Sequence, residues 1–318
     1  MGDQPSSVND RRRLPRRSSR AGAVTVALCL LVLLAASGVV VPPAQASHDT
    51  EPSSGDPLVF AAGDIARPPG SDPNVGNVRV ADLIEDQSPQ PDLILTLGDN
   101  QYDSGTLAQF NGENAFDETW GRFKSRMRPT FGDEDYGPGG PTDTGYYDYF
   151  NGPGNPSGPA GPENLGYYSF DIGAWHVVVL NTEVDTAADS AQADWLRNDL
   201  ATHPRTCTLA TAHRPFFSSN QSGSGNMEAL AGILYDNGAD LLLSGHVHSY
   251  ERFRKQDLDG GADANGFRQF VVGTGGHSTG SLVPTPEAGS EARGDKYGVL
   301  KLTLRPTSYA WDFIALPG

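Results

Sequence analysis

The chain has 318 residues, of which 38 are glycine and 24 are proline, and its formal net charge at pH 7 is −16. A surface that binds nucleic acid or an anionic membrane needs clusters of Lys and Arg, so this charge argues against both kinds of partner. The charge leaves a small anionic substrate open, because bound metal ions can supply positive charge locally.

The first 46 residues have the layout of a secretory signal. Six arginines precede an apolar run over residues 21–41, and Ala44-Gln45-Ala46 offers a cleavage site. We therefore expect a secreted or cell-envelope protein that keeps no stable membrane contact after cleavage. The alternative is an uncleaved anchor, since a membrane-spanning helix needs roughly 20 apolar residues.

Residues 47–57 are expected to form a linker, and residues 58–318 a single domain in which short apolar runs alternate with helical stretches. Predicted strands lie at residues 58–62, 92–97, 128–131, 167–170, 176–180, 207–212, 241–243, 269–272, 298–304 and 309–314. Predicted helices lie at residues 76–87, 190–201 and 227–236, and residues 106–127 are expected to be mostly helical, with a break near Asn111-Gly112. This alternation indicates an α/β fold of βαβαβ units with antiparallel C-terminal strands. Residues 137–162 are expected to form a long functional loop.

Five of the predicted strands end in a carboxylate or an imidazole. The polar residues at these ends are Asp64, Asp99, Asp133, His213 and the pair His246 and His248. A single Asp in such a place usually caps a helix or shapes a turn, but five coincident ends are hard to explain in that way. Because strand ends of an α/β sheet converge on one crevice, and because carboxylates and imidazoles bind metal ions, the sequence predicts a metal site there.

The order of these motifs resembles that of the calcineurin-like metallophosphoesterases, and within them the purple acid phosphatases. In that branch the blocks read GD, GDxxY, GNH[ED], VxxH and GHxH. The matching blocks here are Gly63-Asp64, Gly98 to Tyr102, Gly132 to Asp135, Ala210 to His213 and Gly245 to His248. The resemblance spans residues 58 to 315, and the chain is similar to the compact bacterial type of this branch. It implies a metallophosphatase-type β-sandwich of two mixed sheets flanked by helices.

The resemblance also implies a site for two metal ions. Asp99 would bridge them, and Asp64, Tyr102 and His248 would complete the first site, which holds Fe(III) in the family. Asp133, His213 and His246 would hold the second ion, which is Zn, Mn or Fe(II) in the family. Carboxylates and phenolate suit a trivalent ion, and imidazoles suit a borderline divalent ion. Such a pair of ions can generate a hydroxide that attacks a phosphate monoester, or a diester, in line.

Two positions depart from the family pattern. Asp133 stands where the family has Asn, and Glu134 stands where the family has a His that contacts the phosphate and helps to protonate the leaving group. A carboxylate beside a phosphate is repulsive unless its pKa is raised. Glu134 and Asp99 are therefore the candidate catalytic residues. The alternative is an attenuated relative that binds metal ions and phosphorylated ligands without efficient turnover.

Two further residues are candidates for binding the small phosphorylated substrate. Asn100 follows the bridging Asp99 and could hydrogen-bond the phosphate, although an Asn there could equally shape a turn. Arg214 follows His213 and could grip a substrate oxygen, and the alternative is a salt bridge to a nearby acid. His277, in a glycine loop, is a weaker candidate, and His176 is expected to be structural.

Overall fold

The computed structural model describes residues 45–46, 55–72, 76–137, 145–220 and 226–317. The expected signal and linker lie almost wholly outside these residues, so both stay predictions. None of the helices in the described ranges combines the length and the apolar character that a membrane span needs.

The first sheet has six strands in the order β1-β15-β14-β2-β3-β4. Its strands are β1 Gln45–Ala46, β2 Leu58–Ala62, β3 Leu93–Leu97, β4 Met127–Thr130, β14 Gly298–Leu304 and β15 Ser308–Ala315. Strands β2, β3 and β4 are parallel neighbours, and β14 is antiparallel to both β2 and β15. Helix α1 (Gly76–Glu85) connects β2 to β3. Every residue of β2 and β3 is buried, as expected for parallel strands that are covered on both faces.

The second sheet has seven strands in the order β13-β11-β12-β10-β9-β8-β7. Its strands are β7 Tyr168–Ile172, β8 Trp175–Val179, β9 Cys207–Ala212, β10 Leu241–Ser244, β11 Tyr250–Gln256, β12 Phe267–Val272 and β13 Ser290–Gly294. The central strands β8, β9, β10 and β12 are parallel, and the outer strands pair antiparallel. Helix α4 (Ala191–Thr202) joins β8 to β9, and α5 (Glu228–Asp236) joins β9 to β10.

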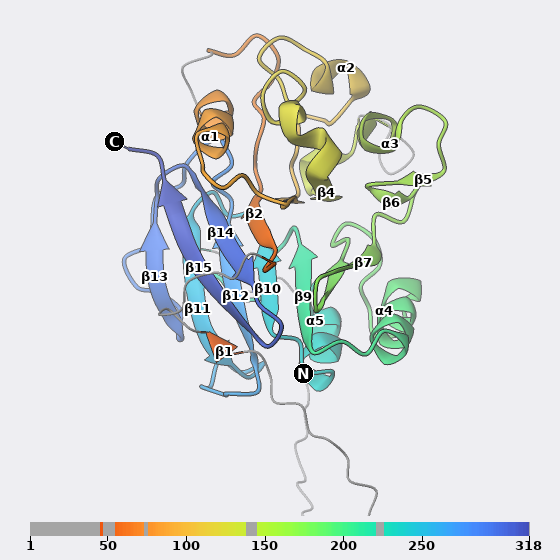
Figure 1. Ribbon diagram of the computed structural model, residues 1–318, viewed down its shortest axis with the longest axis vertical. Coiled ribbons are helices and arrows are strands. Elements are labelled where there is room, and N and C mark those ends of the chain that lie inside the picture. The colour runs from red at the N-terminus through yellow and green to blue at the C-terminus, as the bar shows by residue number, and fades with distance from the viewer. Residues whose placement is uncertain (1–44, 47–54, 73–75, 138–144, 221–225, 318) are drawn as a thin grey trace, which may run out of the picture. The chain divides into compact units, whose positions relative to one another are not determined.

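The main hydrophobic core contains buried side chains from both sheets, such as Phe60 and Leu95 of the first sheet and Leu209 and Phe270 of the second. A second cluster lies where α4 and α5 cover the other face of the second sheet. Figure 1 shows these two helices beside β9 and β10, and the strands of the two sheets one behind the other. The predicted α/β sandwich of two mixed sheets flanked by helices is therefore confirmed.

Two predicted segments differ from the structure, and two strands were not foreseen. The helix expected at residues 106–127 does break at Asn111 as predicted, but it is much shorter than expected: only α2 (Leu107–Phe110) and a 3-10 helix at Trp120–Arg126 form there, and Met127 already belongs to β4. The chain turns between them at Asn114, whose φ of 55° is incompatible with a continuous helix. The loop expected at residues 137–162 contains α3 (Gly145–Asn151) and a small hairpin, β5 Ser157–Gly158 and β6 Gly161–Pro162. Strands β11 and β13 were not predicted.

The carboxyl ends of the parallel strands of the two sheets are joined directly by backbone hydrogen bonds. The amide of Gly63, after β2, donates to the carbonyl of Val272 at the end of β12 (2.9 Å). The amide of Gly275, after β12, donates to the carbonyl of Gly63 (2.8 Å), and within the second sheet the amide of Gly245, after β10, donates to the carbonyl of His213, after β9 (3.0 Å). The strand ends from both sheets therefore meet at one place, where the predicted site residues begin.

Candidate metal centre

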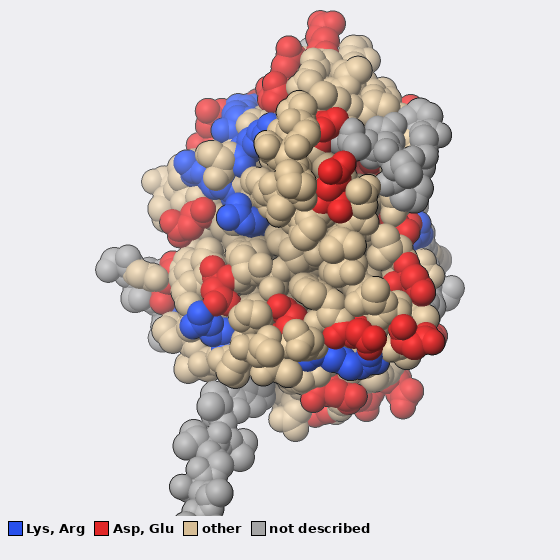
Figure 2. Space-filling model, turned by 90° about the vertical axis from the view of Figure 1, so that its right-hand side faces the viewer, with Lys and Arg blue, Asp and Glu red and all other residues tan. Residues whose placement is uncertain are grey.

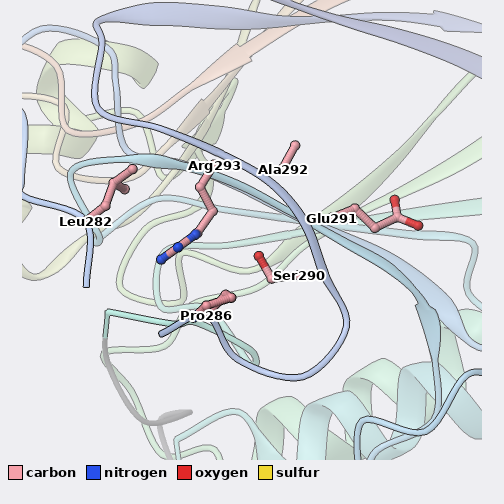
Figure 3. A pocket seen from close by; sticks show the side chains of 6 residues that line it. All are labelled: Leu282, Pro286, Ser290, Glu291, Ala292 and Arg293. Carbon is pink, nitrogen blue, oxygen red and sulfur yellow. The ribbon is translucent and has the colours of Figure 1, made fainter. Parts of the chain in front are cut away.

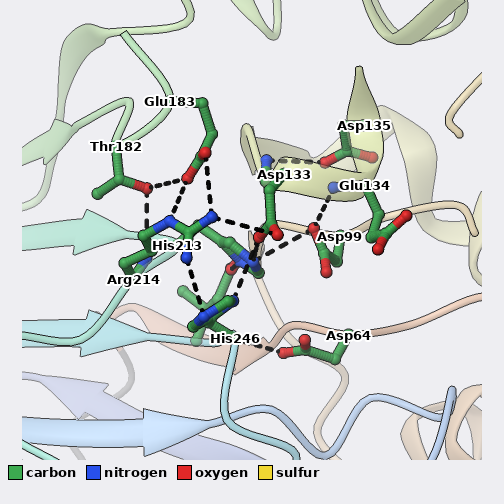
Figure 4. A network of polar contacts seen from close by, with 12 residues as sticks. Asp64, Asp99, Asp133, Glu134, Asp135, Thr182, Glu183, His213, Arg214 and His246 are labelled. Atoms are coloured by element: carbon green, nitrogen blue, oxygen red, sulfur yellow. Dashed lines mark hydrogen bonds and ion pairs between the residues drawn. The ribbon is translucent and has the colours of Figure 1, made fainter. Parts of the chain in front are cut away.

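The turns after β2, β3, β4, β9 and β10 bring the predicted ligands together. Figure 4 shows Asp64, Asp99, Asp133, His213 and His246 pointing toward one another from these turns. Each of these residues directly follows a strand or lies within three residues of one. The strand ends expected to converge on one crevice therefore do so.

Glycines allow the turns to pack this closely. A Cβ at Gly98, where φ is 88°, would lie 2.3 Å from Nδ1 of His213. A Cβ at Gly245 would lie 2.6 Å from the carbonyl oxygen of Leu97 and 2.8 Å from Oδ2 of Asp64. Because no side chain fits at these positions, the glycines that precede Asp99 and His246 are steric requirements of the site.

Three of the candidate ligands have left-handed backbone conformations. The φ angles of Asp64, Asp99 and His246 are 58°, 49° and 64°. A non-glycine residue in this region costs about 1–3 kcal/mol, and such residues cluster at functional sites where the surrounding structure holds them. Here the hydrogen bonds between the turns hold them, for example the bond from the amide of His246 to Oδ2 of Asp64 (2.8 Å).

The first ligand group consists of Asp64, Asp99, Tyr102 and His248. The Tyr102 hydroxyl donates to Oδ2 of Asp99 at 2.6 Å and lies 3.1 Å from Oδ1 of Asp64. Nε2 of His248 lies 3.1 Å from the same Asp64 oxygen and 3.3 Å from the Tyr102 hydroxyl. Four potential ligand atoms thus face one another around a small volume, as the resemblance implies for the first metal ion.

Tyr102 is a buried phenol between two carboxylates. Burial, followed by the charges of Asp64 and Asp99, raises its pKa far above the usual value. Without a cation the side chain therefore keeps its proton. A metal ion at this place would offset the two carboxylate charges and allow Tyr102 to bind as phenolate, which is the role the resemblance implies for it.

The second ligand group consists of Asp133, His213 and His246, whose potential ligand atoms all lie within 4.8 Å of one another. Nε2 of His213 is 2.9 Å from Oδ1 of Asp133 and 3.2 Å from Oδ1 of Asp99. Nδ1 of His246 is 3.2 Å from the same Asp133 oxygen. Asp99 therefore contacts Tyr102 of the first group and His213 of the second. Its role as a bridging ligand stays a prediction.

His213 has the surroundings of a metal ligand. Its Nδ1 is 2.8 Å from the carbonyl oxygen of Leu97, an arrangement that directs Nε2 into the site. Although Nε2 and Oδ1 of Asp133 are close, both atoms are buried and neither makes a hydrogen bond of acceptable geometry. A buried polar atom without a partner is costly, so this pair fits a site completed by a cation.

The electrostatics of the second group support the same conclusion. Burial lowers the pKa of His213, but the charge of Asp99 and the contact with Asp133 outweigh it and raise this pKa well above its usual value. Burial raises the pKa of Asp133, and its contacts with His213 and His246 outweigh that effect, so the net shift is downward. A proton is thus held where a metal ion would lie, and binding of the ion would displace it. The residues present fit a pair of metal ions.

Glu134, which stands in place of the family's His, lies on the Asp99 side of the site (Figure 4). Its backbone amide donates to Oδ1 of Asp99 (2.9 Å). Burial, followed by the charges of Asp99, Asp133 and Asp103, raises the pKa of Glu134. This is the direction that a carboxylic acid needs if it is to act near a phosphate.

Asn100 lies behind the ligands. It is fully buried, and its side-chain amide donates to Oδ2 of Asp135 (2.8 Å) and to the carbonyl of Thr130 (3.0 Å). Asp135 also accepts from the amide of Gly132 (3.0 Å), and burial together with the charge of Asp99 raises its pKa to about 8. Asn100 and Asp135 thus join the turn after β3 to the turn after β4, and a contact of Asn100 with substrate would require these bonds to change.

Arg214 is held in the site mainly by Glu183, a residue that the sequence analysis did not single out. Its guanidinium contacts both carboxylate oxygens of Glu183 at 2.8 and 3.2 Å, and it reaches Asp133 and His246. Glu183 follows β8, so a search for acids after every predicted strand would have found it. On the other side, Oγ of Ser278 lies 2.6 Å from Nδ1 of His248.

Two other histidines are placed by the structure. His277 stacks on Tyr102 with ring centroids 3.6 Å apart, so it lies beside the first ligand group. His176 lies near the amino end of β8, away from the carboxyl ends that carry the candidate ligands, and it lies between Asp171 and Asp199. A pocket of about 330 Å³ lies at β13, and Figure 3 shows its lining side chains, among them Arg293 and Ser290. No candidate ligand lines this pocket.

The fold and this double ligand group define the class of protein: an α/β sandwich that carries a candidate dinuclear metal centre on the ends of its strands. The profile of the Calcineurin-like phosphoesterase family matches residues 53–250, and the chain belongs to this family. The resemblance predicted from the motifs is therefore confirmed.

Curated relatives are purple acid phosphatases. The chain is 34% identical over 140 residues to purple acid phosphatase 22 of Arabidopsis thaliana, which is 41% of this chain and 32% of that protein. It is 31% identical over 159 residues to probable purple acid phosphatase 20 of the same plant, which is 46% of this chain and 37% of that protein. The matched regions thus span about a third of the length of these relatives.

Among solved structures, the purple acid phosphatase PPD1 from seeds of yellow lupin (Lupinus luteus) is similar to this chain, with a TM-score of 0.62 and 18% identity. The match covers 86% of this chain and 52% of that chain. At this identity the likeness shows the fold alone.

Proposed function

We propose that the chain hydrolyses phosphate monoesters, or diesters, at a dinuclear metal centre. The observation that carries this proposal is the position of Asp99, whose two carboxylate oxygens contact Tyr102 at 2.6 Å and His213 at 3.2 Å. One carboxylate thus joins a hard, oxygen-rich ligand group to a group with two imidazoles. Membership of the calcineurin-like family supports the same reaction class.

Seven residues would hold the two ions, in the two groups described above. Bound metal ions supply Lewis acidity toward a phosphoryl oxygen and an activated water as nucleophile. Because the first group offers two carboxylates and a phenol, it suits Fe(III), whereas the imidazoles of the second group suit Zn, Mn or Fe(II). The metal identities belong to this proposal.

Residues around this centre would orient the metal ligands and transfer protons. Leu97 holds His213 through its carbonyl, and the amide of Glu134 holds Asp99. We propose that Glu134 gives a proton to the leaving oxygen of the ester, since burial and the neighbouring carboxylates raise its pKa in the metal-free protein. In its ionised form it would repel the phosphate, so the activity should depend on the fraction of Glu134 that is protonated.

The substrate we propose is a small phosphorylated molecule and not a nucleic acid. Figure 2 shows acidic side chains spread over one face of the molecule, with basic side chains gathered mainly at its upper left and a few others beside acidic ones. With a net charge of −16, such a surface does not attract a polyanion. The export of the protein out of the cytoplasm, which residues 1–46 predict, is part of the same proposal.

The second candidate function is binding of metal ions and phosphorylated ligands without efficient turnover. Glu134 favours it, because a carboxylate surrounded by Asp99, Asp133 and Asp103 is a poor neighbour for a phosphate dianion unless it is protonated. The two candidates differ in one measurable quantity, the rate of ester hydrolysis by the metal-loaded protein.

The test is hydrolysis of an aryl phosphate together with metal analysis of the purified protein. If the protein is an enzyme, the wild type turns over, and Asp99→Ala loses bound metal and at least about a thousandfold in rate, since the bridging ligand serves both ions. Asp194→Ala, at an exposed residue of α4, is the matched control and should change nothing. A wild type that binds two metal ions but gains roughly a hundredfold or more in rate on Glu134→His would favour the binding protein. A protein that binds no metal would overturn both candidates.

A further inference from the structure

Arg214 places a fixed positive charge inside the second ligand group. Two of its guanidinium nitrogens contact the carboxylate of Glu183 at 2.8 and 3.2 Å. Nη2 also lies 3.2 Å from Oδ2 of Asp133, and Nη1 lies 3.0 Å from Nε2 of His246. Figure 4 shows the guanidinium between these three side chains. Asp133 and His246 are two of the three residues expected to hold the second metal ion.

The contact between Arg214 and His246 determines which ring nitrogen carries a proton. A guanidinium has only donors, so Nε2 of His246 must accept this hydrogen bond. The proton of the neutral ring then lies on Nδ1, which faces Oδ1 of Asp133 at 3.2 Å. A metal ion binds an imidazole nitrogen that has no proton. Both nitrogens of His246 are therefore engaged, one by Arg214 and the other by its own proton.

The other two histidine ligands are free of this conflict. Nδ1 of His213 faces the carbonyl of Leu97, an acceptor that keeps a proton on Nδ1 and leaves Nε2 for a metal ion. Nδ1 of His248 faces Oγ of Ser278, which can accept as well, and Nε2 points to Asp64 and Tyr102. Only His246 has a cation on the nitrogen that should carry the proton in a metal-bound ring.

We propose that Arg214 is a positioning residue that competes with the second metal ion. In the metal-free protein its guanidinium offsets the charge of Asp133 and holds His246 in the tautomer that cannot bind metal. The second ion binds only when Arg214 releases His246, so the second site has a lower affinity than the first. This inference rests on the proposed function, because it assumes that the two ligand groups bind metal ions.

The first test is titration of the full-length, metal-free protein with Zn²⁺, followed by calorimetry and metal analysis. The wild type should bind one Zn²⁺ tightly and a second more weakly. Arg214→Gln should raise the affinity for the second Zn²⁺ by roughly tenfold or more, which corresponds to the free energy of one charged hydrogen bond. The affinity for the first Zn²⁺ should stay unchanged. Arg214→Lys keeps the charge, but a lysine cannot contact Glu183 and His246 together. The affinity of this variant for the second Zn²⁺ should therefore lie between those of the wild type and Arg214→Gln. Arg205→Gln, at an arginine that pairs with Asp171, is the matched control and should titrate like the wild type.

The second test reads the tautomer directly, by nitrogen-15 NMR of the histidine rings with His246→Gln for assignment. In the metal-free wild type, Nε2 of His246 should be unprotonated, and Arg214→Gln should shift the proton toward Nε2. Arg214→Lys provides a second variant if Arg214→Gln does not fold, as judged by thermal unfolding.

The outcomes separate this inference from the proposed function. If the second Zn²⁺ binds Arg214→Gln no more tightly than the wild type, or if Nε2 of His246 carries the proton in the metal-free wild type, competition by Arg214 is wrong while the dinuclear centre stands. If neither the wild type nor any variant binds Zn²⁺, the proposed function itself fails, and this inference fails with it.

Discussion

His213 and His176 are both buried histidines that lie between two carboxylates, but their surroundings differ in one respect. Nδ1 of His176 is 2.8 Å from Oδ1 of Asp171, and its Nε2 is 2.7 Å from Oδ2 of Asp199. His213 instead has a backbone carbonyl at Nδ1, and its two carboxylates both face Nε2. By proximity alone, each of the two histidines belongs to a group that could hold a metal ion.

The difference shows what separates a structural histidine from a metal ligand. A ring with a carboxylate on each nitrogen is held as an imidazolium and has no lone pair to offer. Asp199 is further fixed by Oγ of Ser169 (2.8 Å), so the His176 group is a closed network of hydrogen bonds. Nε2 of His213 has no well-formed hydrogen bond, and its proton can be displaced. The expectation that His176 is structural agrees with this geometry.

The largest effect should follow from replacing His213. We expect His213→Gln to lose the second metal ion and to slow aryl phosphate hydrolysis by more than roughly a hundredfold, because one metal ion contributes several kcal/mol to the transition state. Metal analysis and the hydrolysis assay measure the two effects. His176→Gln is the matched control and should keep both metal and activity. If His176→Gln lost metal as His213→Gln does, the distinction between the two histidines would be wrong.

Replacing His176 should instead affect folding. His176→Gln leaves Asp199, which is 5% exposed, without its cationic partner, so we expect a loss of about 3 kcal/mol in the free energy of unfolding. Urea unfolding of the metal-free protein measures it. His203→Gln removes a half-exposed histidine that contacts the same carboxylate at 3.1 Å, and should cost less than about 1 kcal/mol. Equal losses in the two variants would contradict the importance of the buried pair.

The sequence predicts the site better than it predicts the edges of the sheets. The ligands at the ends of β2, β3, β9 and β10 were predictable because each follows a short, mostly apolar run that is buried along all or nearly all of its length. Both β11 and β13 were missed. Strand β11 has the sequence YERFRKQ, whose charged side chains interrupt the alternation of apolar and polar residues that predicts a strand. The partners of these charged side chains come from distant segments, so the sequence near β11 does not reveal them. Buried Glu251, for example, accepts hydrogen bonds from Ser219 and from Ser290 (2.6 Å).

The residues around the ligands were also beyond the reach of local patterns. The bond of Arg214 to Glu183 and the bond of His248 to Ser278 join segments that are 31 and 30 residues apart in the chain. Nothing in the sequence around Arg214 distinguishes a substrate contact from the contact with His246. Because Asn100 follows Asp99, the sequence allows both a substrate contact and a role in shaping a turn, whereas the burial of Asn100 beside Asp135 depends on how the turn after β4 folds.

The smallest effect is a dependence of stability on pH that comes from the His176 network. Burial lowers the pKa of His176, but its contacts with Asp199 and Asp171 outweigh this and raise the pKa above 6.5. The imidazolium therefore stabilises the fold fully below about pH 6.5 and loses this contribution as the pH rises through the folded-state pKa.

The carboxylates of this network contribute to stability with the opposite dependence on pH. Burial raises the pKa of Asp199, and its hydrogen bonds to His176 and Ser169 lower it to a net value below 3.8, so its contribution is present above that pH and is lost on further acidification. The difference in unfolding free energy between the wild type and His176→Gln should thus be greatest between about pH 4 and pH 6.5 and shrink toward pH 9. Urea unfolding of both proteins at pH 5.5, 7 and 9 measures this difference. A difference that grew with pH would mean that His176 is neutral in the folded protein, and the ring would then have a lone pair available to a metal ion after all.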